Sequence, residues 1–151
     1  MADLPGNFLD MLNEANSIVQ ADYPDAGFYE AAINRGLLGA PWQFVFSDPP
    51  AATVILKHGE GRFWTPPQHI DSPWGGDIVI PLPIDLELTD AWALCEQNGC
   101  GGDPQFITLR HPLVPGDNEP YYIFGMPATN QRCFVGVNTR QVTCEPLQPD
   151  G

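Results

Sequence analysis

The sequence has very few basic residues. Only six of its 151 residues are Lys or Arg, against 19 Asp and Glu, and the formal net charge is −13. No stretch gathers Lys or Arg into a stripe that could neutralise phosphates, and the same shortage disfavours an anionic membrane surface. We therefore expect neither nucleic acid nor a membrane as a partner.

Long hydrophobic runs are also missing. No apolar stretch approaches the roughly 20 residues that a bilayer-spanning helix needs, and residues 1–6 have neither the basic start nor the apolar segment of a secretory leader. We therefore expect a soluble, cytoplasmic protein. Its four cysteines would then stay thiols, whereas secretion would make them candidates for two disulfides.

Signatures of metal sites and of catalysis are absent as well. The cysteines lack the Cys-x-x-Cys spacing of structural zinc sites, and no EF-hand spacing occurs. Ser72 lies near His69 and Asp71 but lacks a nucleophile-elbow pattern. The other histidines, His58 and His111, are scattered along the chain. We therefore predict that the protein is not an enzyme.

Two amphipathic helices are predicted by apolar residues at helical spacing. The first begins after the Pro5-Gly6 break, where Asn7 can act as the cap, and it ends before Pro24. The second runs over residues 89–99, with Thr89 as its cap and Asn98-Gly99 as its terminator.

Three short β-prone runs follow each predicted helix. They cover residues 28–34, 42–48 and 53–58, and then residues 105–111, 121–125 and 133–138, with a return strand at 141–144. Pro41 aligns with Pro120, and Val54 aligns with Phe134 at almost the same offset. We interpret this as an internal duplication, although a chance match between two α+β segments is the alternative.

The predicted fold is therefore α+β, with two units that each pack one helix on a three-stranded antiparallel sheet. The first unit would span residues 1–76 and carry a Trp- and Pro-rich insertion at 59–76. The second would span residues 77–151 and begin with an extended segment over 77–88, where aliphatic residues alternate. Together the units would form one compact domain.

The second unit resembles the PepSY-type domain, a small helix-plus-antiparallel-sheet module. The likeness rests on residues 89–99, 105–110, 119–124 and 133–142, although Arg140 and Gln141 stand where a turn glycine is expected. This resemblance implies a binding or protease-regulating module. As a whole, the chain also looks like small leaderless fungal proteins, some of which carry pigments.

The insertion is the densest group of aromatic residues outside the predicted core, and we expect an ordered binding loop there. The alternative is that Trp64 and Trp74 only fold back as a lid over a small core. With aromatic residues of both units, the insertion predicts a site for an aromatic small molecule. The predicted ligand-binding residues are Trp42, Phe63, Trp64, His69, Trp74 and Tyr122.

A calcium ion could accompany this ligand. Glu60, Asp71 and Asp77 offer oxygen ligands around the insertion, and a cation would offset the −13 charge toward an anionic ligand. A solvated acidic surface is the alternative. The sequence thus predicts a non-enzymatic binding protein for an aromatic ligand or pigment. A protein-binding module such as a protease inhibitor is the second hypothesis, and open sheet edges also fit a homodimer.

Overall fold

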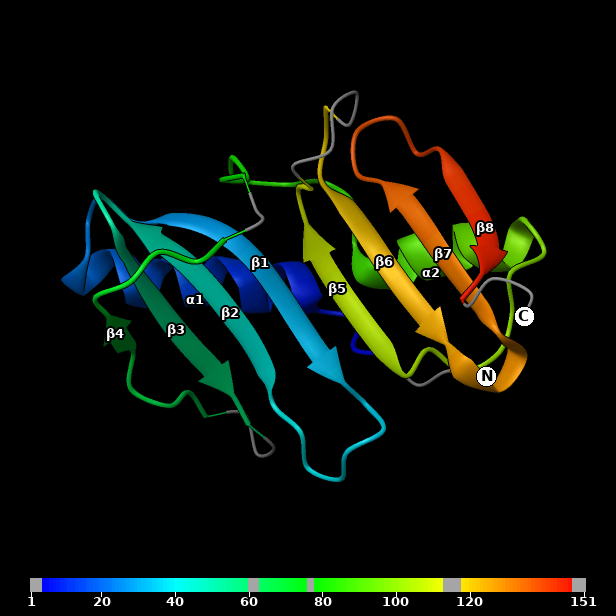
Figure 1. Ribbon diagram of the computed structural model, residues 1–151, viewed down its shortest axis with the longest axis horizontal. Coiled ribbons are helices and arrows are strands. Elements are labelled where there is room, and N and C mark those ends of the chain that lie inside the picture. Colours follow the sequence, from blue (N-terminus) through cyan, green and yellow to red (C-terminus); the bar gives the residue numbers. More distant parts are fainter. Residues whose placement is uncertain (1–3, 60–62, 76–77, 113–117, 148–151) are drawn as a thin grey trace.

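The computed structural model contains a single broad sheet with both helices behind it (Figure 1). It describes residues 4–59, 63–75, 78–112 and 118–147. Within these residues, eight antiparallel strands pair in the order β4-β3-β2-β1-β5-β6-β7-β8. Strands β1 and β5 therefore form the centre of the sheet, and β4 and β8 form its two edges.

The chain follows the sheet outward from the centre twice. Its first helix and strands are α1 (Phe8–Asp22), β1 (Gly27–Asn34), β2 (Trp42–Asp48), β3 (Ala52–His58) and β4 (Gln68–Ile70). Its second set is α2 (Leu88–Gln97), β5 (Phe106–Arg110), β6 (Tyr121–Met126), the 3₁₀ turn η1 (Pro127–Thr129), β7 (Gln131–Gly136) and β8 (Val142–Pro146).

The hydrophobic core lies between the helices and one face of the sheet. Phe8 of α1 is fully buried there, with ring centroids 4.9 Å from Trp42 and 5.9 Å from Tyr122. Trp92 of α2 packs on Phe124 at 5.2 Å. Burying a side chain such as Phe8 contributes about 1.5–3 kcal/mol, so this layer provides the main stabilisation of the fold.

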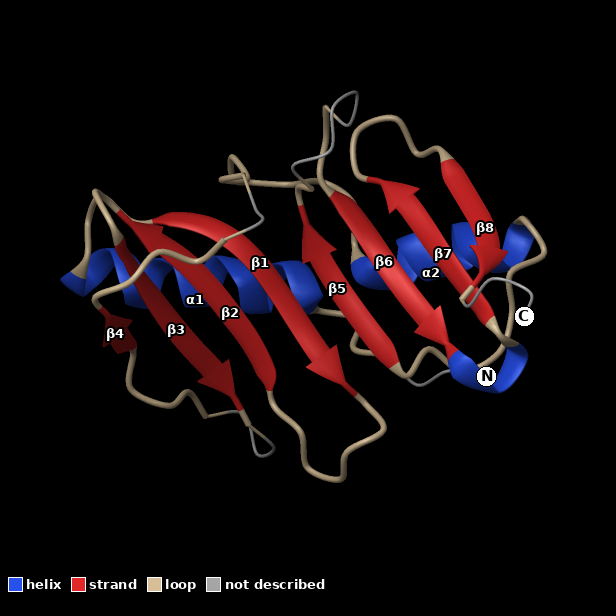
Figure 2. Cartoon of the chain, in the orientation of Figure 1, coloured by secondary structure: helices blue, strands red, loops and turns tan. Residues whose placement is uncertain are grey.

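The two helices begin close together behind the central strands and run apart from there (Figure 2). Glu87 lies at this junction. Its carboxylate accepts a hydrogen bond from the backbone N–H of Leu9 in α1 at 3.1 Å and another from that of Leu88 in α2 at 3.2 Å. Because N-terminal N–H groups of a helix lack intrahelical acceptors and carry partial positive charge, one carboxylate satisfies both helix starts.

This architecture corrects the predicted fold. The prediction of two helix-plus-three-strand units is wrong, because β1 pairs with β5 along five residue pairs, including Glu30 with Arg110, and joins all strands into one sheet. Each helix is also followed by four strands, since residues 68–70 of the predicted insertion form β4. A physical reason for the joined sheet is that pairing satisfies strand edges that separate units would expose.

The helix caps also differ from those predicted. Asn7 occupies the N-cap position of α1 but makes no side-chain capping bond, and α2 begins at Leu88 with Glu87 as its cap rather than Thr89. Residues 78–87 form no strand, although Ile80 is buried and its N–H donates to the Phe28 carbonyl at 2.8 Å.

Two disulfides hold the α2 side of the molecule together. Cys95 of α2 is bonded to Cys133 of β7, and Cys100 is bonded to Cys144 of β8. Of the two cysteine states that the sequence left open, the structure has the disulfides. None of the described helices is long and apolar enough to cross a membrane.

Candidate functional site

The face of the sheet opposite the helices carries a group of exposed and half-exposed side chains on β5–β8. Cross-strand partners point to the same side of a sheet, so the register defines this group. One row runs through Thr108, Ile123, Phe134 and Thr143. We call the whole set the open face; its members are Phe106, Thr108, Arg110, Tyr121, Ile123, Arg132, Phe134, Thr143 and Glu145.

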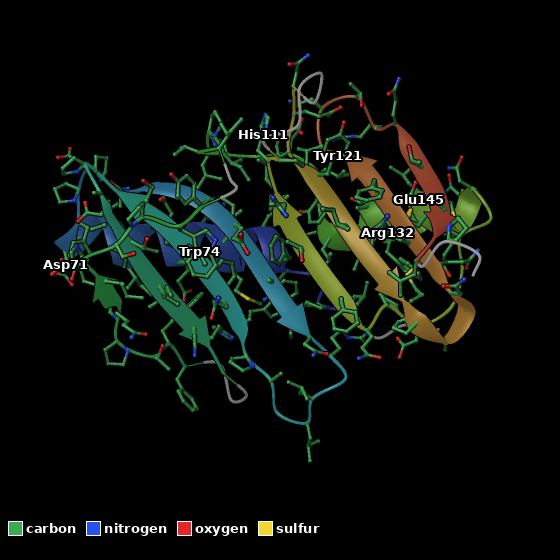
Figure 3. All side chains as sticks on the ribbon, in the orientation of Figure 1. Asp71, Trp74, His111, Tyr121, Arg132 and Glu145 are labelled. Carbon is green, nitrogen blue, oxygen red and sulfur yellow. A yellow bond between two sulfur atoms is a disulfide. The ribbon has the colours of Figure 1, made fainter. Side chains whose placement is uncertain are left out.

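The aromatic and basic side chains of the open face contact one another. The Arg132 guanidinium lies 5.2 Å from the centroid of the Phe134 ring, and Tyr121 meets the same ring edge-on at 6.5 Å. Arg132 also donates through Nε and Nη2 to one carboxylate oxygen of Glu145, at 3.2 and 2.6 Å. These contacts fix Arg132 and the aromatic rings in place (Figure 3). Pre-arranged Tyr and Arg side chains are typical of the energetic centres of protein interfaces.

The part of the same face over β2 and β3 is covered instead. Val45 and Ile55 point away from the helices, yet only 0% and 9% of their surfaces are exposed. The segment after β4 crosses in front of β3 and β2, the strands that carry these two residues (Figure 1). It is held by a hydrogen bond from the Thr53 hydroxyl to the Ser72 carbonyl at 2.7 Å and by one from the Trp74 indole to Glu30 at 3.0 Å. Trp74 therefore covers the sheet. On the open face Tyr121, Ile123 and Phe134 stay half-exposed, and the described coverage lies at the glycine positions: Leu147 reaches Gly125, and Glu119 lies over Gly136.

The loop between β1 and β2 extends the apolar surface beside the open face. Leu38 is fully exposed at its tip and Leu37 is largely exposed. Leu37, Phe106 and Lys57 line a shallow hollow of about 370 Å³ next to it. Phe106 is 42% exposed and packs over Gly125, where an added Cβ would lie only 3.3 Å from the ring. Exposed apolar patches of this kind mark interaction sites.

Charge is distributed unevenly over the molecule. Of the cationic residues that the structure describes, Arg110 and Arg132 lie on the open face, and Lys57 lies on the same side of the sheet. Arg110 stands directly across from Glu30, and Arg132 is paired with Glu145. The open face is thus close to neutral in a chain of net charge −13.

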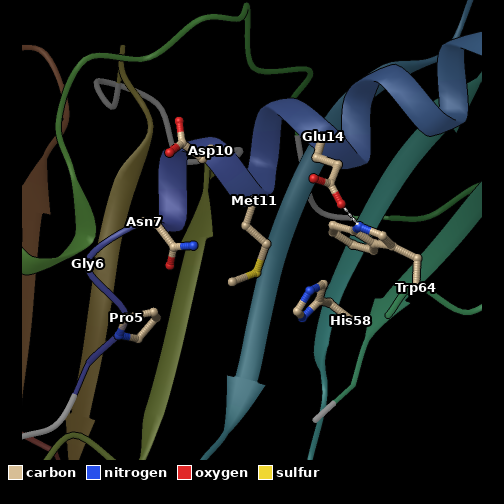
Figure 4. Close-up of a pocket in the computed structure, with 8 residues that line it drawn as sticks. All are labelled: Pro5, Gly6, Asn7, Asp10, Met11, Glu14, His58 and Trp64. Carbon is tan, nitrogen blue, oxygen red and sulfur yellow. Dashed lines mark hydrogen bonds between the residues drawn. The ribbon is translucent and has the colours of Figure 1, made fainter. Parts of the chain in front are cut away.

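A separate cavity of about 680 Å³ lies on the helix side, between the first turns of α1 and the end of β3 (Figure 4). Asp10, Met11 and Glu14 line it from α1, and His58 and Trp64 line it from the opposite side. The Trp64 indole N–H donates to Glu14, and the His58 ring meets Trp64 edge-on at 4.6 Å.

The structure does not bring the predicted ligand-binding residues together. Trp42 and Tyr122 belong to the buried core. The Tyr122 hydroxyl donates to the Leu86 carbonyl at 2.7 Å, and burial, together with the nearby carboxylate of Glu87, raises the pKa of this tyrosine.

The other four predicted residues lie at separate places. Phe63 is 63% exposed, Trp64 lines the cavity and Trp74 covers the outer side of the sheet. His69 on β4 stacks on Tyr23 and contacts Asp48 at 2.9 Å. The predicted wall of these side chains is therefore not a single surface.

Two of the three predicted calcium ligands, Glu60 and Asp77, lie outside the described residues. The third, Asp71, is exposed and lies 3.4 Å from His69. In the described part of the chain, no group of three or more His, Cys, Asp or Glu side chains is placed to hold a metal ion.

Sequence reasoning missed the residues of the open face. The signal was present, because Phe106, Thr108 and Arg110 alternate with the buried Ile107 and Leu109 along one strand. The same alternation separates the half-exposed Tyr121 from the buried Tyr122. The period of two identifies outward side chains, but it does not say which of them a loop covers.

The chain matches no protein-family profile and no curated protein sequence. Among solved structures it is similar to the crystal structure of a protein described as a "putative lipoprotein" from Clostridium difficile 630, with a TM-score of 0.68 and 13% sequence identity. The match covers 89% of this chain and 91% of that one. At this identity the likeness concerns the fold alone, and the PepSY-type resemblance stays a prediction.

Proposed function

We propose that the protein is a non-enzymatic protein-binding module whose partner docks on the open face. The observation that carries this proposal is the cluster of Tyr121, Ile123 and Phe134 beside Arg132, which stays half-exposed on the outer side of β6 and β7. Aromatic residues and Arg are enriched in protein interfaces, whereas Lys, Glu and Asp are depleted. Arg132 and the aromatic rings fit that composition, and Glu145 compensates the charge of Arg132.

The partner that fits this surface is a basic protein with an apolar docking patch. The net charge of −13 attracts a basic protein over long range. Because the open face itself is close to neutral, little charge has to be desolvated when the partner docks on it. A second copy fits less well, because two chains of charge −13 repel each other. The predicted homodimer therefore becomes an outcome that the test can report.

The predicted cytoplasmic location stays a prediction, and the disulfides weigh against it. Both disulfides join buried or half-buried cysteines within one half of the molecule. Disulfides form and persist in oxidising compartments and are rare in the cytosol. We therefore infer that the protein works with its partner in an oxidising environment.

The test is site-specific photo-crosslinking combined with matched variants. A crosslinking amino acid at Leu38, beside the open face, is expected to trap one basic protein in an extract of the source. The same amino acid at Ser17, on the exposed surface of α1, is expected not to trap it. The captured protein is then titrated against Phe134→Ala and Phe106→Ala, with Phe63→Ala as the control because Phe63 is an exposed aromatic residue away from the open face.

Phe134→Ala is expected to weaken binding by about tenfold or more, as truncation of an interface hot spot does, and Phe63→Ala is expected to leave it unchanged. Equal binding by all variants would overturn the proposal. Crosslinking of the chain only to itself would also overturn it and would establish the homodimer instead.

A further inference from the structure

We propose that the cavity beneath α1 binds an organic cation, meaning an ammonium group attached to an apolar body. The site is independent of the open face, since it lies on the helix side of the sheet. Its volume of about 680 Å³ falls within the range of known small-molecule sites, about 300–1,000 Å³. The lining supplies negative charge, an aromatic ring and an apolar side chain.

The negative charge comes from two carboxylates of α1. Asp10 and Glu14 are four residues apart, so they lie on the same side of the helix, and both line the cavity. Glu14 bonds to the Trp64 indole, and the Asp10 side chain has no hydrogen-bond or ion-pair partner among the described residues. Because like charges at this spacing repel each other, a cation between them would relieve the repulsion.

The described Lys and Arg side chains all lie elsewhere, and His58 is the basic side chain in the lining. Lys57 and Arg132 point from the other side of the sheet, and Arg35 and Arg140 form ion pairs with Asp103 and Asp85. Arg110 lies on the open face. The described protein therefore supplies no Lys or Arg to the cavity lining, and an external cation would be the counterion of its carboxylates.

The aromatic wall selects an organic cation over a simple inorganic one. Trp is the strongest of the aromatic side chains at binding cations through its ring face. Trp64 is held by Glu14, by the edge-on His58 ring and by the Phe44 ring at 5.4 Å, so its indole is fixed before a ligand arrives. Met11 adds a flexible apolar contact for the body of the ligand.

The experiment uses benzyltrimethylammonium as the probe, with benzyl alcohol and benzenesulfonate as its neutral and anionic counterparts. Binding is followed by the ¹⁵N–¹H signal of the Trp64 indole, assigned with Trp64→Phe. We expect a saturable shift with the cation and binding at least about tenfold weaker for each counterpart. We also expect binding of the cation to weaken with added salt.

Two matched pairs of variants locate the site. Glu14→Gln is expected to weaken binding about fivefold or more, whereas Asp22→Asn, an exposed carboxylate at the other end of the same helix, is expected to leave it unchanged. Trp64→Leu is expected to abolish binding. Because this variant lacks the reporting indole, its titration is followed by the backbone amide signals of Met11 and Glu14, which also line the cavity. Trp74→Leu is the matched control, because the Trp74 indole also donates to a glutamate, Glu30, but lies on the other side of the sheet. This variant is expected to retain binding.

The proposal is overturned if the Trp64 signal does not move at about 50 mM probe, a concentration well above a dissociation constant of about 1 mM. It is also overturned if benzyl alcohol binds as well as the cation, or if Asp22→Asn and Glu14→Gln weaken binding equally. None of these outcomes affects the protein-binding proposal, because they concern the opposite side of the sheet.

Discussion

Glu119 shows how much one buried carboxylate can organise. Its Oε1 accepts the N–H groups of Asn138 and Thr139 at 2.7 and 2.9 Å, and its Oε2 accepts the Thr139 hydroxyl at 2.6 Å. Burial would raise the pKa of Glu119, but these hydrogen bonds and the charge of Arg140 outweigh burial and lower it. The carboxylate also covers Gly136, where an added Cβ would lie 2.5 Å from Oε2. Glu119 therefore holds the turn between β7 and β8.

Glu119→Gln is expected to lower the free energy of unfolding by about 1–2 kcal/mol at pH 7, because charge-assisted hydrogen bonds become neutral ones. Since the folded-state pKa is depressed, the contribution of Glu119 is present above the ordinary value of 4.5 and is lost as the pH falls through the folded-state pKa. Urea denaturation at several pH values measures this.

The control for Glu119→Gln is Glu96→Gln, because Glu96 is exposed on α2. The difference between wild type and Glu119→Gln should shrink in acid, while Glu96→Gln should stay near wild type throughout. A difference that persists unchanged below the depressed pKa would contradict the role of the ionised carboxylate.

At the scale of elements, the junction of the two helices depends on Glu87. Glu87→Gln is expected to destabilise the fold by about 1–2 kcal/mol, because the negative charge at two helix N-termini is lost together with strong acceptor oxygens. Asp90→Asn is the matched control, since Asp90 is an exposed acid in the first turn of α2 with no described bond to α1. Chemical denaturation followed by far-UV circular dichroism compares them, and an equal loss in both would show that only the helix dipole matters.

The sequence predicted most elements but not their assembly. The spacing of apolar residues located α1 and α2, and the β-prone runs located β1, β2 and β3 in the first half and β5 to β8 in the second. It could not reveal that β1 pairs with β5, because hydrogen bonds between strands far apart in sequence leave no local pattern. The sequence also contained no sign of β4, because Gln68-His69-Ile70 is only three residues long and lies between prolines, which are typical of loops.

The candidate sites were predictable only in part. Trp64 was singled out and lines the cavity, but its partners Asp10 and Glu14 are two ordinary acids in a sequence with 19. For Trp74 the sequence left two interpretations, a ligand-binding residue or a lid over a small core. In the structure Trp74 covers the outer side of the sheet. Which outward side chains remain uncovered depends on the path of that loop, and composition does not determine the path.

At the scale of the whole molecule, the two disulfides stabilise one half only. Both connect α2 and the residues after it to β7 and β8, and α1 with β1–β4 has none. Reduction is expected to lower the free energy of unfolding by about 3–4 kcal/mol for each disulfide, from the entropy regained by the unfolded chain. Hydrogen exchange should show β7 and β8 losing protection before β2 and β3. Loss of protection beginning in β2 and β3 would contradict this.

The pairing of β1 with β5 has a consequence for synthesis. β1 is complete at Asn34, but β5 is not complete until Arg110. At a rate of synthesis of about 5–20 residues per second, the edge of β1 stays without its partner strand for about 4–15 s. During that time the nascent chain presents an unpaired strand edge next to a forming apolar layer, a combination that favours aggregation. Chaperone dependence during translation should therefore be concentrated in the interval between these two strands.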